Sequence, residues 1–224
     1  MGRGEENYTG LKRFCGALSV DLFGVADVGR INKEFQISQK ALEGIDRAVC
    51  LGAVLSESIL EDIEASPTRL YFHHYRTVNA FLDQAALKVC GYIRKKGYRA
   101  LAIPASQILD WQAQKAHLSH KRIGYLAGLG WIGRHNLLVN KAFGSQFRLV
   151  TVLTNMPLKA DRPVRQDCAD CRLCIEVCPC AAIGENPSDF DYLKCFEKLK
   201  DFQKQRLVDQ YVCGVCVKAC RGNK

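Results

Sequence analysis

Apolar positions along the first 160 residues follow two periods, one typical of strands and one typical of helices. Apolar and β-branched runs at 22–26, 47–55 and 98–103 predict strands. Helices are predicted at 8–19, from Ser56 to about residue 65, from 66 to 96 and at 121–129. The longest helix has an apolar face at helical spacing, made by Tyr71, Tyr75, Val78, Leu82, Ala85, Val89 and Ile93. A strand pair is predicted from 136–140 and 147–154, with its turn at Gly144.

This alternation predicts an α/β (α+β) domain over residues 1–160. From residue 165 onward the spacing of cysteines governs the chain instead. Eight cysteines form two interlocking sets, Cys168-x2-Cys171-x2-Cys174-x3-Cys178-Pro179 and Cys195 followed by Cys213-x2-Cys216-x3-Cys220. The first set has the spacing of bacterial dicluster ferredoxins. Residues 161–224 are therefore predicted to form a ferredoxin-like module with two [4Fe–4S] clusters.

The spacing also predicts which cysteines share a cluster. Three thiolates at i, i+3 and i+6 wrap three corners of a cuboidal cluster, and the next cysteine lies on the departing chain and ligates the other cluster. The first cluster is predicted to take Cys168, Cys171, Cys174 and Cys220. The second is predicted to take Cys178, Cys195, Cys213 and Cys216.

Zinc and disulfides are the alternatives for these cysteines. Zinc needs only pairs of CxxC and leaves the third closely spaced cysteine unexplained. Disulfides need an oxidising compartment, which nothing else in the sequence indicates. Of the four remaining cysteines, Cys15, Cys50 and Cys90 lie among apolar neighbours and are predicted to be buried thiols. Cys180 follows Pro179 and is predicted to pack beside a cluster.

The net charge of +9 is unevenly distributed. Residues 1–68 carry a net charge of −4, residues 69–157 carry +11, and residues 158–224 carry +2. All five histidines also lie in the middle segment. A basic segment beside an electron-transfer module suggests an anionic ligand, either nucleic acid or a phosphate-bearing cofactor. A solvated basic face that aids solubility explains the charge equally well.

The polar N-terminus contains no apolar signal core. The longest run without a charged residue covers eleven residues, 123–133, which is too short to span a bilayer. These features and the free thiols predict a cytoplasmic protein that makes no membrane contact.

The segment 127–133 contains a formal GxGxxG pattern, but no strand precedes it and no acidic residue follows within the next twenty. We therefore reject a dinucleotide fold. Gly128, Gly130 and Gly133 instead predict a close approach of the backbone, either to a packed strand or to a flat cofactor beside Trp131.

Three residues are candidates for proton donation. Asp110 is the only carboxylate between Asp83 and Asp161, in a strongly basic neighbourhood. A structural ion pair and a general acid are both consistent with its position. His74 and Tyr75 lie early in the long helix, where Tyr75 belongs to the apolar face and His74 does not.

Residues 120–139, HKRIGYLAGLGWIGRHNLLV, resemble the signature segment of epoxyqueuosine reductases. The Phe143-Gly144-Ser145 turn, the strand at 152–154 and the CxxCxxCxxxCP motif followed by Ala182-Ile183 are also similar. The resemblance implies a cytoplasmic enzyme in which two [4Fe–4S] clusters reduce a cobalamin. It also implies removal of an epoxide oxygen from a modified tRNA base in queuosine biosynthesis, with a flavodoxin or ferredoxin as electron donor.

The chain departs from that family at the presumed proton donor. Family members place an aspartate directly after the strand that corresponds to 98–103, whereas Pro104-Ala105-Ser106 follows it here and Asp110 is the nearest acid. Two functions therefore remain open. One is a cobalamin-linked reductase, and the other is a non-catalytic electron carrier or maturation partner that docks on another protein.

Overall fold

The computed structural model describes residues 2–110, 113 and 115–222, which gather into two units. Unit 1 contains residues 1–53, 79–129 and 148–164, and unit 2 contains residues 54–78, 130–147 and 165–224. Neither unit is continuous in sequence. Unit 2 combines the cysteine-rich segment with two segments from within the first 160 residues, whereas the sequence predicted two continuous domains.

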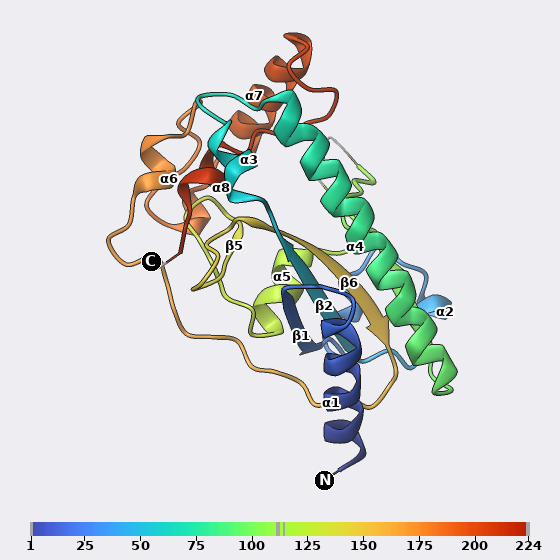
Figure 1. Cartoon of the computed structure of the whole chain (residues 1–224). Coiled ribbons are helices and arrows are strands. Elements are labelled where there is room, and N and C mark those ends of the chain that lie inside the picture. Colours follow the sequence, from blue (N-terminus) through green and yellow to red (C-terminus); the bar gives the residue numbers. More distant parts are fainter. Residues whose placement is uncertain (1, 111–112, 114, 223–224) are drawn as a thin grey trace. The chain divides into compact units, whose positions relative to one another are not determined.

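Unit 1 is built on a four-stranded sheet with the order β1-β2-β6-β3 (Figure 1). Its strands are β1 (Leu22–Asp27), β2 (Arg47–Val54), β6 (Phe147–Thr154) and β3 (Ala100–Ile103). β1 is antiparallel to β2, and β3 is antiparallel to β6. The two central strands are buried almost throughout. Because both of their faces are covered, they appear in the sequence as continuous apolar runs.

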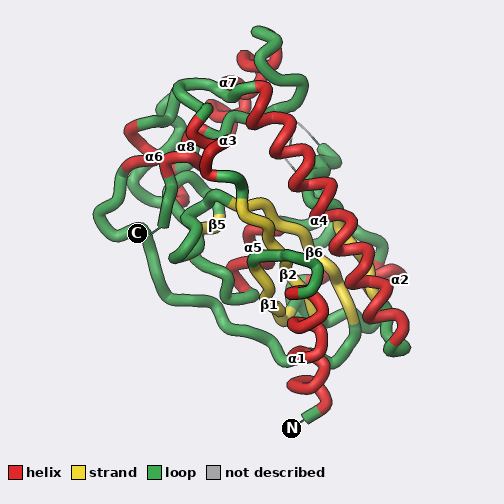
Figure 2. Tube along the Cα trace, in the orientation of Figure 1, coloured by secondary structure: helices red, strands yellow, loops and turns green. Residues whose placement is uncertain are grey.

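Helices cover both faces of this sheet (Figure 2). Helix α5 (His120–Leu126) packs on β1, where a Cβ added to Gly24 would lie 2.4 Å from the carbonyl oxygen of Ala127. The opposite face is covered by α1 (Arg3–Gly16) and α4 (Arg69–Lys95). These two helices meet through Phe14 and Tyr92, whose stacked rings lie 4.6 Å apart. The short elements η1 (Asn32–Glu34) and α2 (Gln39–Leu42) lie in the β1–β2 connection.

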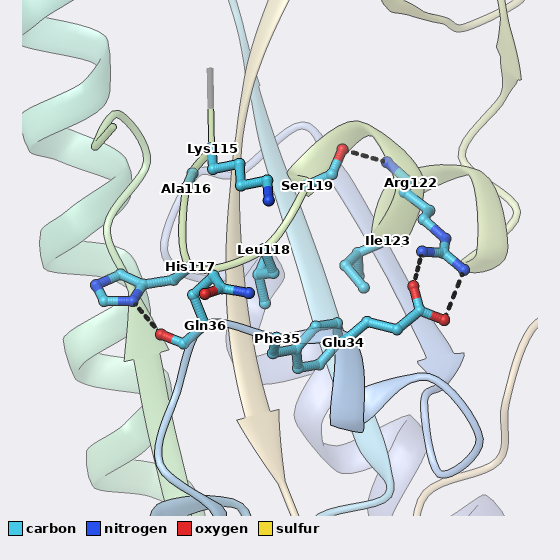
Figure 3. A pocket seen from close by; sticks show the side chains of 10 residues that line it. All are labelled: Glu34, Phe35, Gln36, Lys115, Ala116, His117, Leu118, Ser119, Arg122 and Ile123. Atoms are coloured by element: carbon cyan, nitrogen blue, oxygen red, sulfur yellow. Dashed lines mark hydrogen bonds and ion pairs between the residues drawn. The ribbon is translucent and has the colours of Figure 1, made fainter. Parts of the chain in front are cut away.

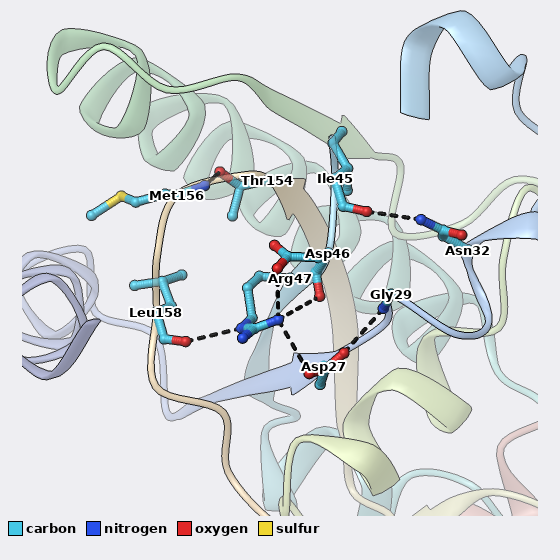
Figure 4. Close-up of polar contacts among 9 residues, drawn as sticks. All are labelled: Asp27, Gly29, Asn32, Ile45, Asp46, Arg47, Thr154, Met156 and Leu158. Atoms are coloured by element: carbon cyan, nitrogen blue, oxygen red, sulfur yellow. Dashed lines mark hydrogen bonds and ion pairs between the residues drawn. The ribbon is translucent and has the colours of Figure 1, made fainter. Parts of the chain in front are cut away.

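Arg47 joins three parts of unit 1 (Figure 4). Its Nη1 lies 3.2 Å from Asp27 Oδ2 at the end of β1 and 3.0 Å from Asp46 Oδ2. Its Nε donates to the carbonyl oxygen of Leu158 at 2.9 Å. Beyond this point, the Asp161 carboxylate accepts the backbone N–H of Val25 at 2.8 Å. The chain after β6 is thereby fixed along the edge of the sheet.

Unit 2 contains short elements joined by long loops. They are α3 (Glu57–Glu61), the first ten residues of α4, the hairpin strands β4 (Trp131–Ile132) and β5 (Leu138–Val139), α6 (Leu173–Glu176), η2 (Pro187–Asp189), α7 (Tyr192–Lys204) and α8 (Val215–Ala219). Among the helices of the described chain, none is both long and apolar enough to cross a membrane.

The prediction for the long helix is confirmed in its extent and in most of its face. Tyr71, Val78, Leu82, Ala85, Val89 and Ile93 are all buried, and Tyr75 is half-buried. The predicted pairing of 136–140 with 147–154 is wrong. β5 pairs with β4 instead, because Asn136 adopts a φ of 58° and closes a tight turn in which its N–H donates to the Gly133 carbonyl.

Candidate iron–sulfur centre

All eight cysteines predicted as cluster ligands lie in unit 2. Cys168 and Cys171 lie on the loop before α6, and Cys174 lies within α6. Cys195 lies on α7, whose first turn is capped by Asp191 accepting the N–H of Lys194 at 2.9 Å. The remaining predicted ligands lie around α8 and on the loop that follows α6; they are Cys178, Cys213, Cys216 and Cys220.

The thiols that contribute to the pKa of Cys174 are its neighbours in the first set. Burial, with smaller contributions from the charges of Cys220, Cys168 and Cys171, raises the pKa of the Cys174 thiol to about 11. Helices α6 and α8 pack together, which brings the end of the chain next to the first cysteine loop. The thiols that act on Cys174 are thus the other three cysteines predicted for the first cluster.

The thiols that contribute to the pKa values of Cys195 and Cys216 define the neighbours in the second set. Burial, with smaller contributions from the charges of Cys180, Cys213 and Cys178, raises the pKa of Cys195 to about 12. Burial also raises the pKa of Cys216 well above its usual value, with smaller contributions from Cys213, Cys195, Cys178 and Cys174. The predicted second set is therefore joined by one additional thiol, Cys180.

The chemistry of this donor set suits iron–sulfur clusters. Four thiolates are the usual ligands of a [4Fe–4S] cluster, and two sets of four are available here. In the described chain, no three His, Cys, Asp or Glu side chains are grouped as one metal ion would require. A cuboidal cluster holds its thiolates farther apart than a single ion does. The lack of a single-ion site among the described residues therefore says nothing about a cluster site. Because burial raises the pKa of Cys174, Cys195 and Cys216, these three thiols are protonated and their ligation would release protons.

Arg134 holds the loop that carries the first two cysteines. Its guanidinium donates to the carbonyl oxygen of Ala169 at 2.6 Å and to that of Glu185 at 2.9 Å. The Glu185 carboxylate in turn lies 3.3 Å from Arg172 Nε. Ala169 has a φ of 42°, a conformation that an alanine adopts only when its surroundings fix it. No role for Arg134 was predicted from the sequence, although it lies directly after the glycine pattern.

The turn at 143–146 holds the last cysteine. Ser145 N–H donates to the Cys220 carbonyl at 3.1 Å, and Gln146 Nε2 donates to the Lys218 carbonyl at 2.7 Å. A Cβ on Gly144, whose φ is 57°, would lie 1.8 Å from that same Cys220 carbonyl oxygen. Burial raises the pKa of the Cys220 thiol, and the Ser145 hydroxyl partly opposes this rise. Glycine at 144 is therefore required by contact with the cysteine segment as well as by the turn.

Tyr71 supports the turn between Cys213 and Cys216. Gly214 caps α8 with a φ of 88°, and a Cβ there would lie 2.5 Å from the Tyr71 ring. The Tyr75 ring is 6.4 Å from that of Tyr71. His74 lies half-buried beside them and accepts the Ser56 N–H through Nε2 at 2.9 Å. Burial lowers the pKa of His74, so this ring nitrogen is an acceptor without a proton to donate.

Asp110 lies in unit 1, whereas His74 and Tyr75 lie in unit 2. It pairs with Lys115 in an antiparallel bridge, with N–H to carbonyl distances of 3.2 and 3.0 Å. Its carboxylate is exposed and accepts the Ala113 N–H at 2.9 Å. The side chain therefore stabilises its own turn through one carboxylate oxygen.

The glycine pattern contacts the chain itself. A Cβ on Gly130 would lie 1.9 Å from the Val139 carbonyl oxygen, and one on Gly133 would lie 2.6 Å from Val139 Cγ2. In unit 1, Gly128 has a φ of 71°, and a Cβ there would lie 2.6 Å from the Arg162 carbonyl oxygen. Trp131 is only 2% exposed. Packing of the backbone explains these glycines, and a flat cofactor above them stays a prediction.

Unit 1 contains a cavity of about 470 Å³ between η1 and the segment that leads into α5 (Figure 3). Lys115 and Arg122 supply its cationic side chains, and His117 also lines it. Arg122 forms a two-point ion pair with Glu34, and its hydrogen bond holds the pKa of that carboxyl below the usual value. His117 Nδ1 lies 2.9 Å from the Gln36 carbonyl oxygen, so this nitrogen carries a proton. The cavity thus lies between the basic segment and residues 34–36, and Glu34 neutralises one of its cations.

His120 is half-buried in unit 1 and links α5 to β6 and to the end of β3. Its Nδ1 is 2.8 Å from Thr151 Oγ1 on β6, and its Nε2 is 2.8 Å from the Pro104 carbonyl oxygen after β3. A carbonyl only accepts, so Nε2 carries the proton and Nδ1 accepts from the hydroxyl. Burial lowers the pKa of His120 to about 4.

This histidine predicts an acid-sensitive unit 1. The unfolded chain takes up a proton at His120 near pH 6.5, whereas the folded chain does so only near pH 4. Stability is therefore lost as the pH falls from 6.5 to 4, by about 3 kcal/mol in all. Anaerobic urea unfolding at several pH values, followed by circular dichroism, measures this loss. His120→Gln should flatten the dependence, and exposed His73→Gln should leave it unchanged; equal slopes in all three proteins would contradict the expectation.

Comparison with known proteins identifies relatives but no matching family model. The chain is 33% identical over 164 residues to an epoxyqueuosine reductase of Leadbetterella byssophila, a match that covers 63% of this chain and 54% of that protein. It is 34% identical over 110 residues to the epoxyqueuosine reductase of Escherichia coli, covering 44% of this chain and 28% of that protein. The matched part is thus about half the length of the first relative and under a third of the second.

Solved structures share the fold. A reductive dehalogenase, described with a mechanism for B12-dependent dehalogenation, superposes with a TM-score of 0.76 at 21% identity and covers 99% of this chain and 32% of its own. An epoxyqueuosine reductase in complex with an epoxyqueuosine-modified tRNA stem loop gives a TM-score of 0.66 at 16% identity, covering 97% of this chain and 65% of its own. The resemblance read from the sequence is confirmed: the chain is a relative of epoxyqueuosine reductases.

Proposed function

We propose that this relative of epoxyqueuosine reductases is an iron–sulfur oxidoreductase that acts on a modified tRNA base or a chemically similar substrate. The observation that carries the proposal is the gathering of the cysteines in unit 2 into two sets of neighbours. Their spacing is that of a dicluster ferredoxin-like module. When bound, two [4Fe–4S] clusters supply single electrons, and a corrinoid such as cobalamin supplies the reducing centre.

The residues of this chain would hold and insulate the clusters. Cys168, Cys171, Cys174 and Cys220 ligate the first, and Cys178, Cys195, Cys213 and Cys216 ligate the second. Arg134 and the turn at 143–146 fix the two chain segments that would carry the ligands of the first cluster, at Ala169 and at Cys220. We assign no residue to the corrinoid, because the contacts of the glycine pattern are with the chain itself.

Phosphate-bearing partners suit the charge of the middle segment, which carries 13 basic and 2 acidic side chains. Phosphate contacts by lysine and arginine provide most of the affinity for nucleic acid and make it dependent on salt. A tRNA partner and an electron donor such as a flavodoxin or ferredoxin belong to the same proposal, as does a cytoplasmic location.

The test is anaerobic purification followed by reconstitution with iron, sulfide and cobalamin. We expect about eight irons and about eight labile sulfides per chain, retained cobalt after gel filtration, and single-turnover reduction of an epoxyqueuosine-containing stem loop. Iron without cobalt or turnover would favour the electron carrier. Bound zinc without labile sulfide would overturn the proposal.

A further inference from the structure

The second cysteine set contains one thiol more than a cluster needs. A [4Fe–4S] cluster takes four thiolates, and Cys178, Cys195, Cys213 and Cys216 supply that number. Cys180 nevertheless lies among them, with its Sγ 3.8 Å from that of Cys178. Neither thiol is buried completely.

The backbone around residue 181 holds the two sulfurs close together and supplies a donor to one of them. Ala181 has a φ of 48°, which turns the chain sharply after Cys180. The N–H of Ala182 then donates to Cys178 Sγ at 3.3 Å. One backbone dipole is thus placed to stabilise a thiolate at Cys178, and Cys180 Sγ lies 3.8 Å from that sulfur.

Cys180 also faces the rest of the set. Among the thiols whose charge acts on Cys195, Cys180 has the largest effect, ahead of Cys213 and Cys178. Cys180 in turn responds to Cys178 and Cys213. The other three cysteines outside the predicted sets, Cys15, Cys50 and Cys90, are buried in unit 1. No other thiol contributes to their raised pKa.

We propose that Cys180 is a reserve ligand of the second cluster and can replace Cys178 on the same iron. The inference rests on the proposed function only in requiring that unit 2 binds clusters. In the exchange, the Fe–Sγ bond of Cys178 breaks and that of Cys180 forms. The proton of the Cys180 thiol passes to the released Cys178 thiolate, so no electron is gained or lost.

Iron and labile sulfide counts on anaerobically reconstituted full chain test the exchange. Cys178→Ala and Cys180→Ala should each retain about eight irons, and the double variant should retain about four. Cys171→Ala is the matched control, since the thiols acting on Cys174 include no spare member. It should retain about four irons whether Cys180 is present or replaced.

Alkylation of holoprotein with iodoacetamide under anaerobic conditions, read by peptide mass spectrometry, gives a second measurement. Cys180 should be modified in the wild type and protected in Cys178→Ala and in the more conservative Cys178→Ser. Equal iron loss in Cys178→Ala and the double variant, or equal alkylation of Cys180 in wild type and Cys178→Ser, would overturn the reserve ligand. A wild type without iron and sulfide would instead overturn the proposed function.

Discussion

Replacing Cys171 by alanine is expected to remove one cluster and all turnover. The variant should contain about half of the iron and labile sulfide of the wild type, because a cluster that lacks one of its four thiolates is not held. Cys171 is exposed, so its removal leaves no cavity in the core. Secondary structure should therefore persist while the electron path is interrupted.

Iron analysis, circular dichroism and single-turnover assays on the same preparation test whether iron and turnover are lost while the secondary structure persists. Cys15→Ala is the matched control, because Cys15 is a fully buried cysteine of unit 1. That variant should lose stability through the small cavity it creates while retaining all of its iron. Full iron content in Cys171→Ala, or equal iron loss in both variants, would contradict the assignment of Cys171 as a ligand.

Local periodicity was sufficient to predict most of unit 1. The apolar face of α4 and the buried strands β1, β2 and β6 follow from spacing within one element, and that spacing determines which side chains can reach a core. The burial of Cys15, Cys50 and Cys90 was predicted in the same way, from their apolar neighbours, and is confirmed. The cysteine sets were predicted from the reach of a tight loop, which is also a local property.

Contacts between distant segments were not predictable in this way. The hairpin of β4 and β5 has two residues in each strand, too few for an alternating pattern, and it depends on a left-handed asparagine at 136. The roles of Arg134 and of the turn at Gly144 depend on partners 35 residues or more away in sequence. A glycine that must approach a carbonyl and one that must approach a cofactor look the same in a sequence.

Asp110→Asn is expected to lose most turnover while retaining both clusters. In the proposed reaction, reductive opening of the epoxide leaves an alkoxide that must be protonated. A positioned acid contributes a factor of about 10²–10⁴ to the rate of such a step. Asp110 is the only carboxylate between residues 84 and 160. It is exposed, and its Oδ1 accepts the Ala113 N–H.

The Asp110→Asn variant removes the proton that the carboxyl group could donate and keeps the turn, because its amide oxygen can accept the same Ala113 N–H. His74→Gln is the matched control, since a glutamine oxygen can replace the ring nitrogen that accepts the Ser56 N–H. Single-turnover rates with chemically reduced protein compare the two variants at equal iron content. We expect the rate to fall in Asp110→Asn and to persist in His74→Gln. Wild-type rates in Asp110→Asn would remove Asp110 from the mechanism, and loss of turnover in His74→Gln alone would transfer the acid role to His74.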